Sequence, residues 1–162
     1  QLASGAEGRQ AALQEASRRA DELGILAGTL PARGPGLSVR FSNGSKSITA
    51  SAILNAVQEL RGAGAEVMQI SGGDGAAVRI VASTYFLDDG DGVNVAGQRL
   101  TGPYTLTVIG DPETMRTALN IPDGVVESVD GAGGTVTILE RGVAEVTALR
   151  EPTDLQFARP VS

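Results

Sequence analysis

The spacing of hydrophobic and polar positions changes several times along the chain, and each change predicts a new element. Residues 1–27 mix alanine, leucine and charged residues at helical spacing, with no proline before Pro31. This pattern favours one long N-terminal helix. The following segment, 28–36, contains two prolines and three glycines, which is typical of a linker. We therefore expect a helical unit over 1–30, a linker over 31–36 and one α+β domain over 37–162.

The first part of the domain predicts a strand, a helix and a second strand. Apolar and polar residues alternate over Leu37–Phe41, which is the period of a half-buried strand. From Ile48 to Leu60 the apolar residues recur at helical spacing, and either Ser47 or Thr49 can cap the start of that helix. Val67–Ile70 is then a short strand. Residues 37–70 thus form one βαβ unit.

The middle of the chain, residues 71–100, predicts β-hairpin material. Its turns are marked by Gly72–Gly75 and by the acidic run Asp88–Gly92. A calcium loop of the EF-hand type is excluded for that run, because positions five and twelve counted from Asp89 would be Val93 and Leu100. A solvated Asp-Gly turn is the better interpretation.

A second strand followed by helices begins at Tyr104. Tyr104–Ile109 alternates as a strand, and Asp111 with Pro112 has the composition of a helix N-cap followed by the first helical position. A further helical stretch is expected over 124–130. Residues 135–149 are expected to form a hairpin around a turn at Arg141 and Gly142.

The two halves of the domain match each other at a constant offset of 69 residues. Segment 37–70 aligns on 106–139 without a gap, and the triplet at 62–64 falls on the identical triplet at 131–133. Two such βαβ units can interleave in one sheet through right-handed crossovers. The predicted fold is therefore α+β and ferredoxin-like, with helices on one face, an inserted β-hairpin and the N-terminal helix outside it.

Composition removes much of the usual catalytic chemistry. The 162-residue chain has no cysteine and no histidine, which excludes disulfides, thiolate nucleophiles, Cys/His zinc sites and histidine bases. Its formal net charge is −6, the wrong sign for a nucleic-acid binder. Pairs of carboxylates sit at helix ends or on polar faces, where capping explains them. We expect no enzyme activity, no cofactor and no metal.

The N-terminal helix leaves two interpretations open. Its apolar residues can be placed in a heptad register, although alanines replace most of the expected leucines. The helix could lie on its own domain as an amphipathic element or a frayed tail, or it could be the end of a coiled-coil stalk. In the second case it would support self-association as a homodimer. The self-association candidates are Leu2, Leu13 and Leu23.

Arginine and tyrosine residues cluster around the middle hairpin. These residue types are frequent where proteins contact a partner. Ordinary placement on a strand edge or surface is the alternative. The partner-binding candidates are Arg79, Tyr85, Arg99 and Tyr104.

Three stretches carry a resemblance to a bacterial family. They are Gly34–Leu37, Glu59–Glu66 and Gly102–Thr114, and their order and spacing are more specific than any one of them. From Arg33 to Arg159 the chain resembles domain-of-unknown-function family 881, also called uncharacterised protein family 0749. It departs from the family at Ser71–Gly75, where an Asn-Gly-Gln-Arg-like turn is usual.

The resemblance implies a setting rather than an activity. Members are common in Gram-positive and actinobacterial genomes, and carry a membrane-spanning helix, a coiled-coil-like segment and then this domain outside the cytoplasm. The family has no established catalytic residues. The chain begins at Gln1, and we expect an anchor upstream that fixes the protein to the cell membrane.

These observations predict a non-catalytic, extracytoplasmic domain for protein interaction or self-association in an envelope or division-associated protein. The alternative is a small-ligand sensor, which rests on the analogy with ferredoxin-like domains that bind metabolites.

Overall fold

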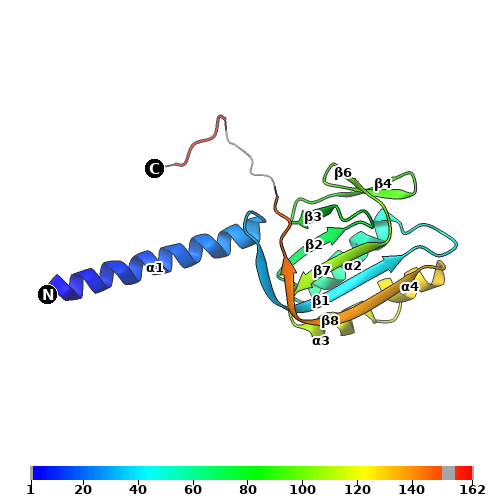
Figure 1. Cartoon of the computed structure of the whole chain (residues 1–162), viewed down its shortest axis with the longest axis horizontal. Helices are drawn as coiled ribbons and strands as arrows, with labels where there is room; N and C mark the ends of the chain where they lie inside the picture. The colour runs from blue at the N-terminus through cyan, green and yellow to red at the C-terminus, as the bar shows by residue number, and fades with distance from the viewer. Residues whose placement is uncertain (1, 151–155, 162) are drawn as a thin grey trace.

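The computed structural model describes residues 2–150 and 156–161, with side chains from Gly5 onward. It consists of a long helix, α1 (Leu2–Ala27), and a mixed α+β domain from which this helix projects (Figure 1). At 1.5 Å per residue, α1 is about 39 Å long. The expected N-terminal helix and α+β class are confirmed.

The domain is built on one antiparallel sheet and a smaller second one. In the five-stranded sheet each strand pairs with its neighbours antiparallel, and the order is β3 (Ala77–Ile80), β2 (Val67–Ser71), β7 (Tyr104–Ile109), β1 (Ala32–Ser42) and β8 (Thr135–Val146). The second sheet is the meander of β4 (Phe86–Asp89), β5 (Gly92–Val95) and β6 (Gln98–Leu100). The three domain helices are α2 (Ala50–Gly62), α3 (Pro112–Leu119) and α4 (Val125–Gly131).

The hydrophobic core lies between the five-stranded sheet and the three domain helices. Alternate residues of the central strands, such as Leu37, Val39 and Leu106, are fully buried on the helix side. They pack in one cluster with the inward residues of α2, among them Ile53 and Val57. The predicted strand and helix periodicities are therefore those of the core.

The opposite face of the same sheet is largely polar. Ser38, Arg40 and Thr107 occupy the alternate positions on this face, and none of them is buried. One end of the face carries a small separate apolar cluster. This cluster contains Val67, Ile109, Ala144 and Val146, with Ile25 and Ala32 packed against it. It lies where α1 meets the domain, so the helix is seated at one end of the polar face.

The linker expected over 31–36 is wrong, because β1 already begins at Ala32. The register of β1 against β8 shifts between Gly34 and Gly36, and this irregularity accommodates Pro35, which has no N–H to donate. The Pro35 carbonyl accepts a hydrogen bond from the Gly110 N–H at 2.9 Å. Residues that normally break structure are here part of an interior strand, opposite a point where β8 has one extra residue.

The hairpin expected over 135–149 is also wrong. β8 is a single strand of 12 residues that follows β1 on both sides of the irregularity. Because β1 offers a partner to both halves of β8, the Arg141-Gly142 pair continues the strand and makes no turn.

Helix caps account for several polar residues. Thr49 and Asp111 accept hydrogen bonds from the N–H groups of Ala52 and Thr114. The N-cap predicted at Asp111 is confirmed, and of the two candidates for α2 the cap is Thr49 and not Ser47. Asp88 belongs to β4 rather than to a solvated turn, and its carboxylate accepts a bond from the Ala50 N–H at 2.8 Å. Each cap satisfies an amide that the helix itself leaves unpaired.

Candidate interaction surfaces

A stripe of apolar and small residues, interrupted by Arg9, runs along α1 and faces solvent. We call this set the α1 stripe; its leucines, Leu13 and Leu23, are 71% and 66% exposed. The stripe follows the spacing of three and four residues that the heptad register requires. Its members are Ala6, Arg9, Leu13, Ala16, Ala20, Leu23 and Ala27. The third predicted self-association residue, Leu2, has a side chain outside the described part.

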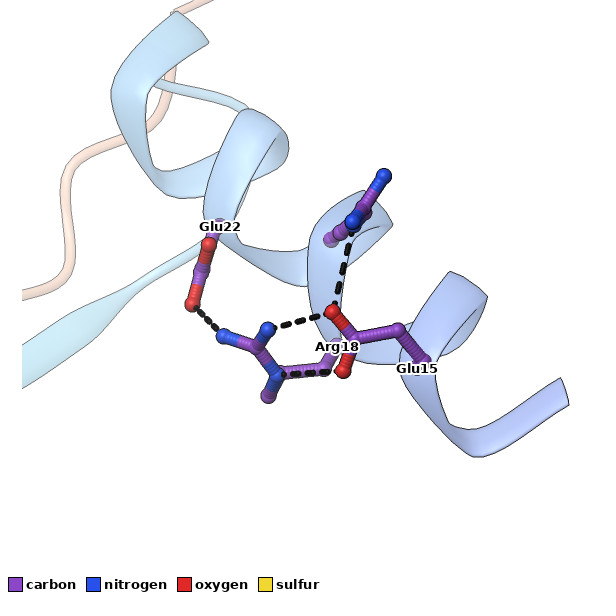
Figure 2. A network of polar contacts seen from close by, with 4 residues as sticks. Glu15, Arg18 and Glu22 are labelled. Atoms are coloured by element: carbon purple, nitrogen blue, oxygen red, sulfur yellow. Dashed lines mark hydrogen bonds and ion pairs between the residues drawn. The ribbon is translucent and has the colours of Figure 1, made fainter. Parts of the chain in front are cut away.

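Arg9 lies in this stripe, whereas the ion-paired residues of α1 gather away from it. Arg18 pairs with Glu15 on one side and with Glu22 on the other, and Arg19 also contacts Glu15 (Figure 2). These bonds lower the pKa of the Glu15 carboxyl and raise that of the Arg18 guanidinium. Pairs three and four residues apart support an exposed helix. The helix is thus two-sided, with no domain residue covering its apolar side in the described chain.

The base of α1 is held by two arginines of the domain. Arg79, on β3, donates to the carbonyl oxygen of Ile25 at 2.9 Å and to that of Ala148 at 3.0 Å. Arg150 donates from Nε to the Ala27 carbonyl at 2.9 Å. The carbonyls of Ile25 and Ala27 lie in the last turn of α1, where a helix lacks internal donors and where positive charge is favourable. The helix is therefore fastened at its C-terminal end.

Arg79 is a buried cation, only 3% exposed. This corrects the expectation that it lies on the surface as a partner contact. It forms no ion pair among the described residues, and burial lowers the pKa of its guanidinium. The backbone carbonyls of two distant segments supply its hydrogen bonds instead, which explains why a charged residue is stable at this depth.

A groove of about 530 Å³ opens beside Arg79, at the outer edge of β3. We call it the β3 groove. It runs between β3 and the turn that joins β5 to β6. Tyr85, a predicted partner residue, lines it and is 49% exposed. The lining residues are Ala77–Arg79, Val81, Ser83–Tyr85, Val95–Gln98, Leu149 and Arg150.

The remaining two partner candidates have other surroundings. Arg99 is partly exposed and pairs with Asp91 at 3.0 Å and with Asp89 at 3.7 Å, which ties β6 to the β4–β5 turn. Tyr104 is fully buried, which corrects its expected place on the surface. Its hydroxyl has no hydrogen-bond partner among the described residues. Burial, and next the nearby Asp91 carboxylate, raise the pKa of this phenol.

The structure brings together residues that the sequence keeps far apart. Arg79 and Tyr85 line one groove, whereas Arg99 and Tyr104 do not reach it. Arg150 was not among the predicted residues, although it fastens α1 and lines the groove. A partial signal existed for Arg79, since it occupies a polar-face position in an alternating strand. Its hydrogen bonds to Ile25 and Ala148 could not be predicted from the neighbouring sequence, because both residues are distant in the chain.

Neither a metal centre nor a membrane span is found within residues 2–150 and 156–161. No group of three or more carboxylates there lies close enough to hold a metal ion. No helix of that part combines the length and apolar character needed to cross a bilayer.

Comparison with known proteins places the chain among uncharacterised bacterial proteins. A family model described as "Bacterial protein of unknown function (DUF881)" matches residues 19–159. The chain is 35% identical over 152 residues to UPF0749 proteins of Mycobacterium tuberculosis and Mycobacterium bovis, covering 94% of this chain and 52% of theirs. The chain thus spans about half the length of these curated relatives.

A solved structure has the same fold. It is described as the crystal structure of an uncharacterized conserved protein from Mycobacterium tuberculosis. The match has a TM-score of 0.82 and 34% sequence identity, and it covers 88% of this chain and 99% of the other.

Proposed function

The chain belongs to the DUF881 family of bacterial proteins of unknown function, and we propose that it is a non-catalytic domain that self-associates through α1. The observation that carries this proposal is the α1 stripe. Leu13 and Leu23 are exposed along a helix whose ion-paired residues Glu15, Arg18 and Glu22 sit on another side. A second copy of the helix would bury both leucines in a coiled-coil seam.

The fastening of α1 supports a role in presentation. Because Arg79 and Arg150 hold the last carbonyls of the helix, its direction is fixed relative to the sheet. Two associated helices would therefore hold two domains in a defined arrangement, with their other surfaces available to partners. If residues 28–31 were instead a flexible joint, the two domains would have no defined arrangement.

For location, we propose a domain outside the cytoplasm, tethered to the cell membrane by a segment beyond this chain. Support comes from the family setting and from a projecting helix that continues the chain away from the domain (Figure 1). Protease treatment of intact cells that carry the full-length protein tests it. We expect the domain to be cleaved while a cytoplasmic marker stays whole, and protection of both would refute the location.

For architecture, we propose two interleaved βαβ units of ferredoxin-like type. The order β8-β1-β7-β2 is the one that two such units produce, with β3 added at the edge. The ends of α2 and α4 agree with this: Ala63 and Ala132 have φ of −91° and −88°, and Gly64 and Gly133 follow at +88° and +91°. Failure of 37–70 to superimpose on 106–139 would contradict the repeat.

Sedimentation equilibrium tests self-association. We expect wild type to form a dimer and the double variant Leu13→Glu, Leu23→Glu to be a monomer, because each buried seam leucine contributes about 1.5–3 kcal/mol. The matched control is Leu139→Glu, which changes a 52%-exposed leucine on β8. A wild-type monomer at a concentration of about 100 µM, where even a Kd of 1 mM would leave some dimer, refutes the proposal.

A small-ligand sensor is the second candidate, and the β3 groove favours it. Its volume of about 530 Å³ is in the range of small-molecule sites. A thermal-shift screen against a metabolite panel tests this, since a ligand at 100 times its Kd adds about 2.7 kcal/mol of stability. No shift with any metabolite removes the candidate.

A further inference from the structure

β8 forms one outer edge of the five-stranded sheet (Figure 1). It pairs with β1 alone, so one side of its 12-residue backbone has no neighbouring strand in the described chain. The other edge strand, β3, has only four residues. Natural sheets shorten, charge or cover their edges, because an uncovered edge accepts a further strand. The β8 edge is thus the longer place on this sheet where a strand can add.

The outward backbone groups of β8 follow from a hydrogen bond on the far side of β1. The Gly110 N–H donates to the Pro35 carbonyl, and hydrogen-bonded pairs alternate along an antiparallel ladder. The even-numbered residues of β1 therefore direct their N–H and C=O groups toward β8, where odd-numbered residues face them. The groups that point away from β1 are those of Val136, Ile138 and Glu140. None of these groups has another hydrogen-bond partner in the described chain.

The regular part of this edge, Thr135–Arg141, is neutral and partly apolar. The extra residue of β8 lies beyond it. Its first five residues are uncharged, favour strands and include neither proline nor glycine, and Leu139 is 52% exposed on the polar face. Glu140 and Arg141 have opposite charges. Two copies of a chain with a net charge of −6 repel each other over most of their surface, but not at this segment.

The segment is also complementary to itself. About a twofold axis, antiparallel strands of one sheet can shift only in steps that keep facing side chains on the same side. The register centred on Ile138 overlaps the whole segment, opposes its outward groups and forms about six main-chain hydrogen bonds. Thr137 then faces Leu139 of the second copy. A shift toward Glu140 runs into the extra residue of β8 or sets two carboxylates face to face.

We propose that β8 pairs antiparallel with β8 of a second copy, centred on Ile138, so that two five-stranded sheets become one. This goes beyond the proposed association through α1, because it uses a different surface of the domain. The contact is about 24 Å long, in the size range of transient interfaces, and it joins α1 dimers into larger assemblies. Leu139→Glu therefore still sediments as the α1 dimer while losing the β8 contact.

Disulfide trapping tests this register, because the chain has no native cysteine. Chains with Thr137→Cys and chains with Leu139→Cys are mixed in equal amounts in a glutathione buffer, and mass spectrometry counts the disulfides. All carry Leu13→Glu and Leu23→Glu, so that α1 takes no part. In the proposed register a disulfide spans the mixed pair, whereas the Cα atoms of like pairs lie more than about 7 Å apart. We expect about tenfold more mixed than like disulfide.

A second mixture and a control complete the trapping. Thr135→Cys and Arg141→Cys face each other in the same register and should also form the mixed disulfide. Leu87→Cys, which changes a 57%-exposed leucine on β4, gives the level of random collision. Random proportions, a preferred Leu139→Cys homodimer or yields at the level of Leu87→Cys overturn the proposal. None of these outcomes alters the sedimentation of wild type, which tests α1 separately.

Charge variants test the contact between residues 137 and 139, with the Thr135→Cys and Arg141→Cys mixture as the reporter. Thr137→Lys with Leu139→Lys sets like charges face to face, whereas Thr137→Lys with Leu139→Glu sets opposite charges there. We expect the mixed disulfide to fall about fivefold or more in the first and to persist in the second. Circular dichroism checks folding, and should either variant fail to fold, the cysteine mixtures decide. Equal yields from two folded variants overturn the proposal.

Discussion

The guanidinium of Arg79 donates from Nη2 to the carbonyl oxygen of Ile25 at 2.9 Å, although the two residues lie 54 positions apart. Ile25 is in the last turn of α1, and Arg79 is on the edge strand β3. The same guanidinium reaches Ala148 after β8. One side chain thus joins the N-terminal helix, the sheet and the segment that follows its last strand.

Replacement of Arg79 should loosen α1 and destabilise the domain. Arg79→Met keeps an unbranched apolar side chain of similar length, but leaves the carbonyls of Ile25 and Ala148 without their donor. We expect a loss of about 2–4 kcal/mol in the free energy of unfolding, measured in urea. Hydrogen exchange should also rise over residues 23–27. Arg116→Met is the matched control, because this arginine pairs with exposed Glu140 and should cost below about 1 kcal/mol. Equal effects of both variants would contradict the role of Arg79.

Glu59, which belongs to α2, should act as the N-terminal cap of the other helix α4. That helix starts after Gly124, which has no capping side chain, and the Glu59 carboxylate of α2 accepts from the Val125 N–H at 3.1 Å. Glu59→Ala should cost about 1 kcal/mol, whereas Glu59→Gln keeps an acceptor and should cost little. Chemical denaturation at pH 7 measures both. An alanine variant as stable as wild type would refute the cap.

The pH dependence of Glu59 follows from its burial. Desolvation raises the pKa of this carboxyl above its ordinary value of 4.5, and the Val125 N–H only partly opposes this. The folded state therefore holds the proton more tightly than the unfolded one, and this contribution is lost as the pH rises through the raised pKa. As the pH rises from 4 to 7, a range that starts just below the ordinary carboxyl pKa of 4.5, Glu59→Gln should become more stable relative to wild type. A difference that stays constant over this range would contradict the prediction.

Tyr104→Phe should stabilise the protein, because the Tyr104 hydroxyl is buried without a partner among the described residues. Removing it should raise the free energy of unfolding by about 1 kcal/mol. The raised pKa of this phenol gives a second signature. Wild type should lose stability as the pH rises above the ordinary value of 10.0, since the unfolded state releases this proton first. Tyr104→Phe should not show the part of the stability loss at alkaline pH that is due to this phenol. Thermal melts of both proteins from pH 8 to pH 11, a range that spans the ordinary pKa of 10.0, compare the two.

Gly36→Ala should be strongly destabilising. A Cβ at this position would lie 1.8 Å from the carbonyl oxygen of Val108, which is backbone of the neighbouring strand β7 and is unable to move aside. We expect a cost above about 3 kcal/mol, or failure to fold. Gly142→Ala is the control, because nothing lies within 4 Å of its Cβ position. Similar soluble yields and melting temperatures for both variants would contradict this packing.

Some of the candidate surface residues were placed correctly from the sequence and others were not. Leu13 and Leu23 were chosen from heptad spacing, which is local information, and both are exposed on the long helix. Tyr85 lines a groove as an exposed residue. Tyr104 and Arg79 were misplaced on the surface. Both sit in alternating strands, and an isolated strand does not reveal what packs over each of its faces.

The order of strands and helices, the caps at Thr49 and Asp111 and the core face of each strand were encoded within short windows of sequence. Periodicity and capping depend on neighbours within a few residues, so they can be recognised without a fold. Tertiary structure alone decided that Gly34–Gly36 belongs to a central strand and that Arg141-Gly142 continues one, because only the presence of β1 beside β8 supplies their hydrogen-bond partners. The same holds for Arg79, whose position at the base of α1 depends on carbonyls from two segments that meet it only in the folded chain.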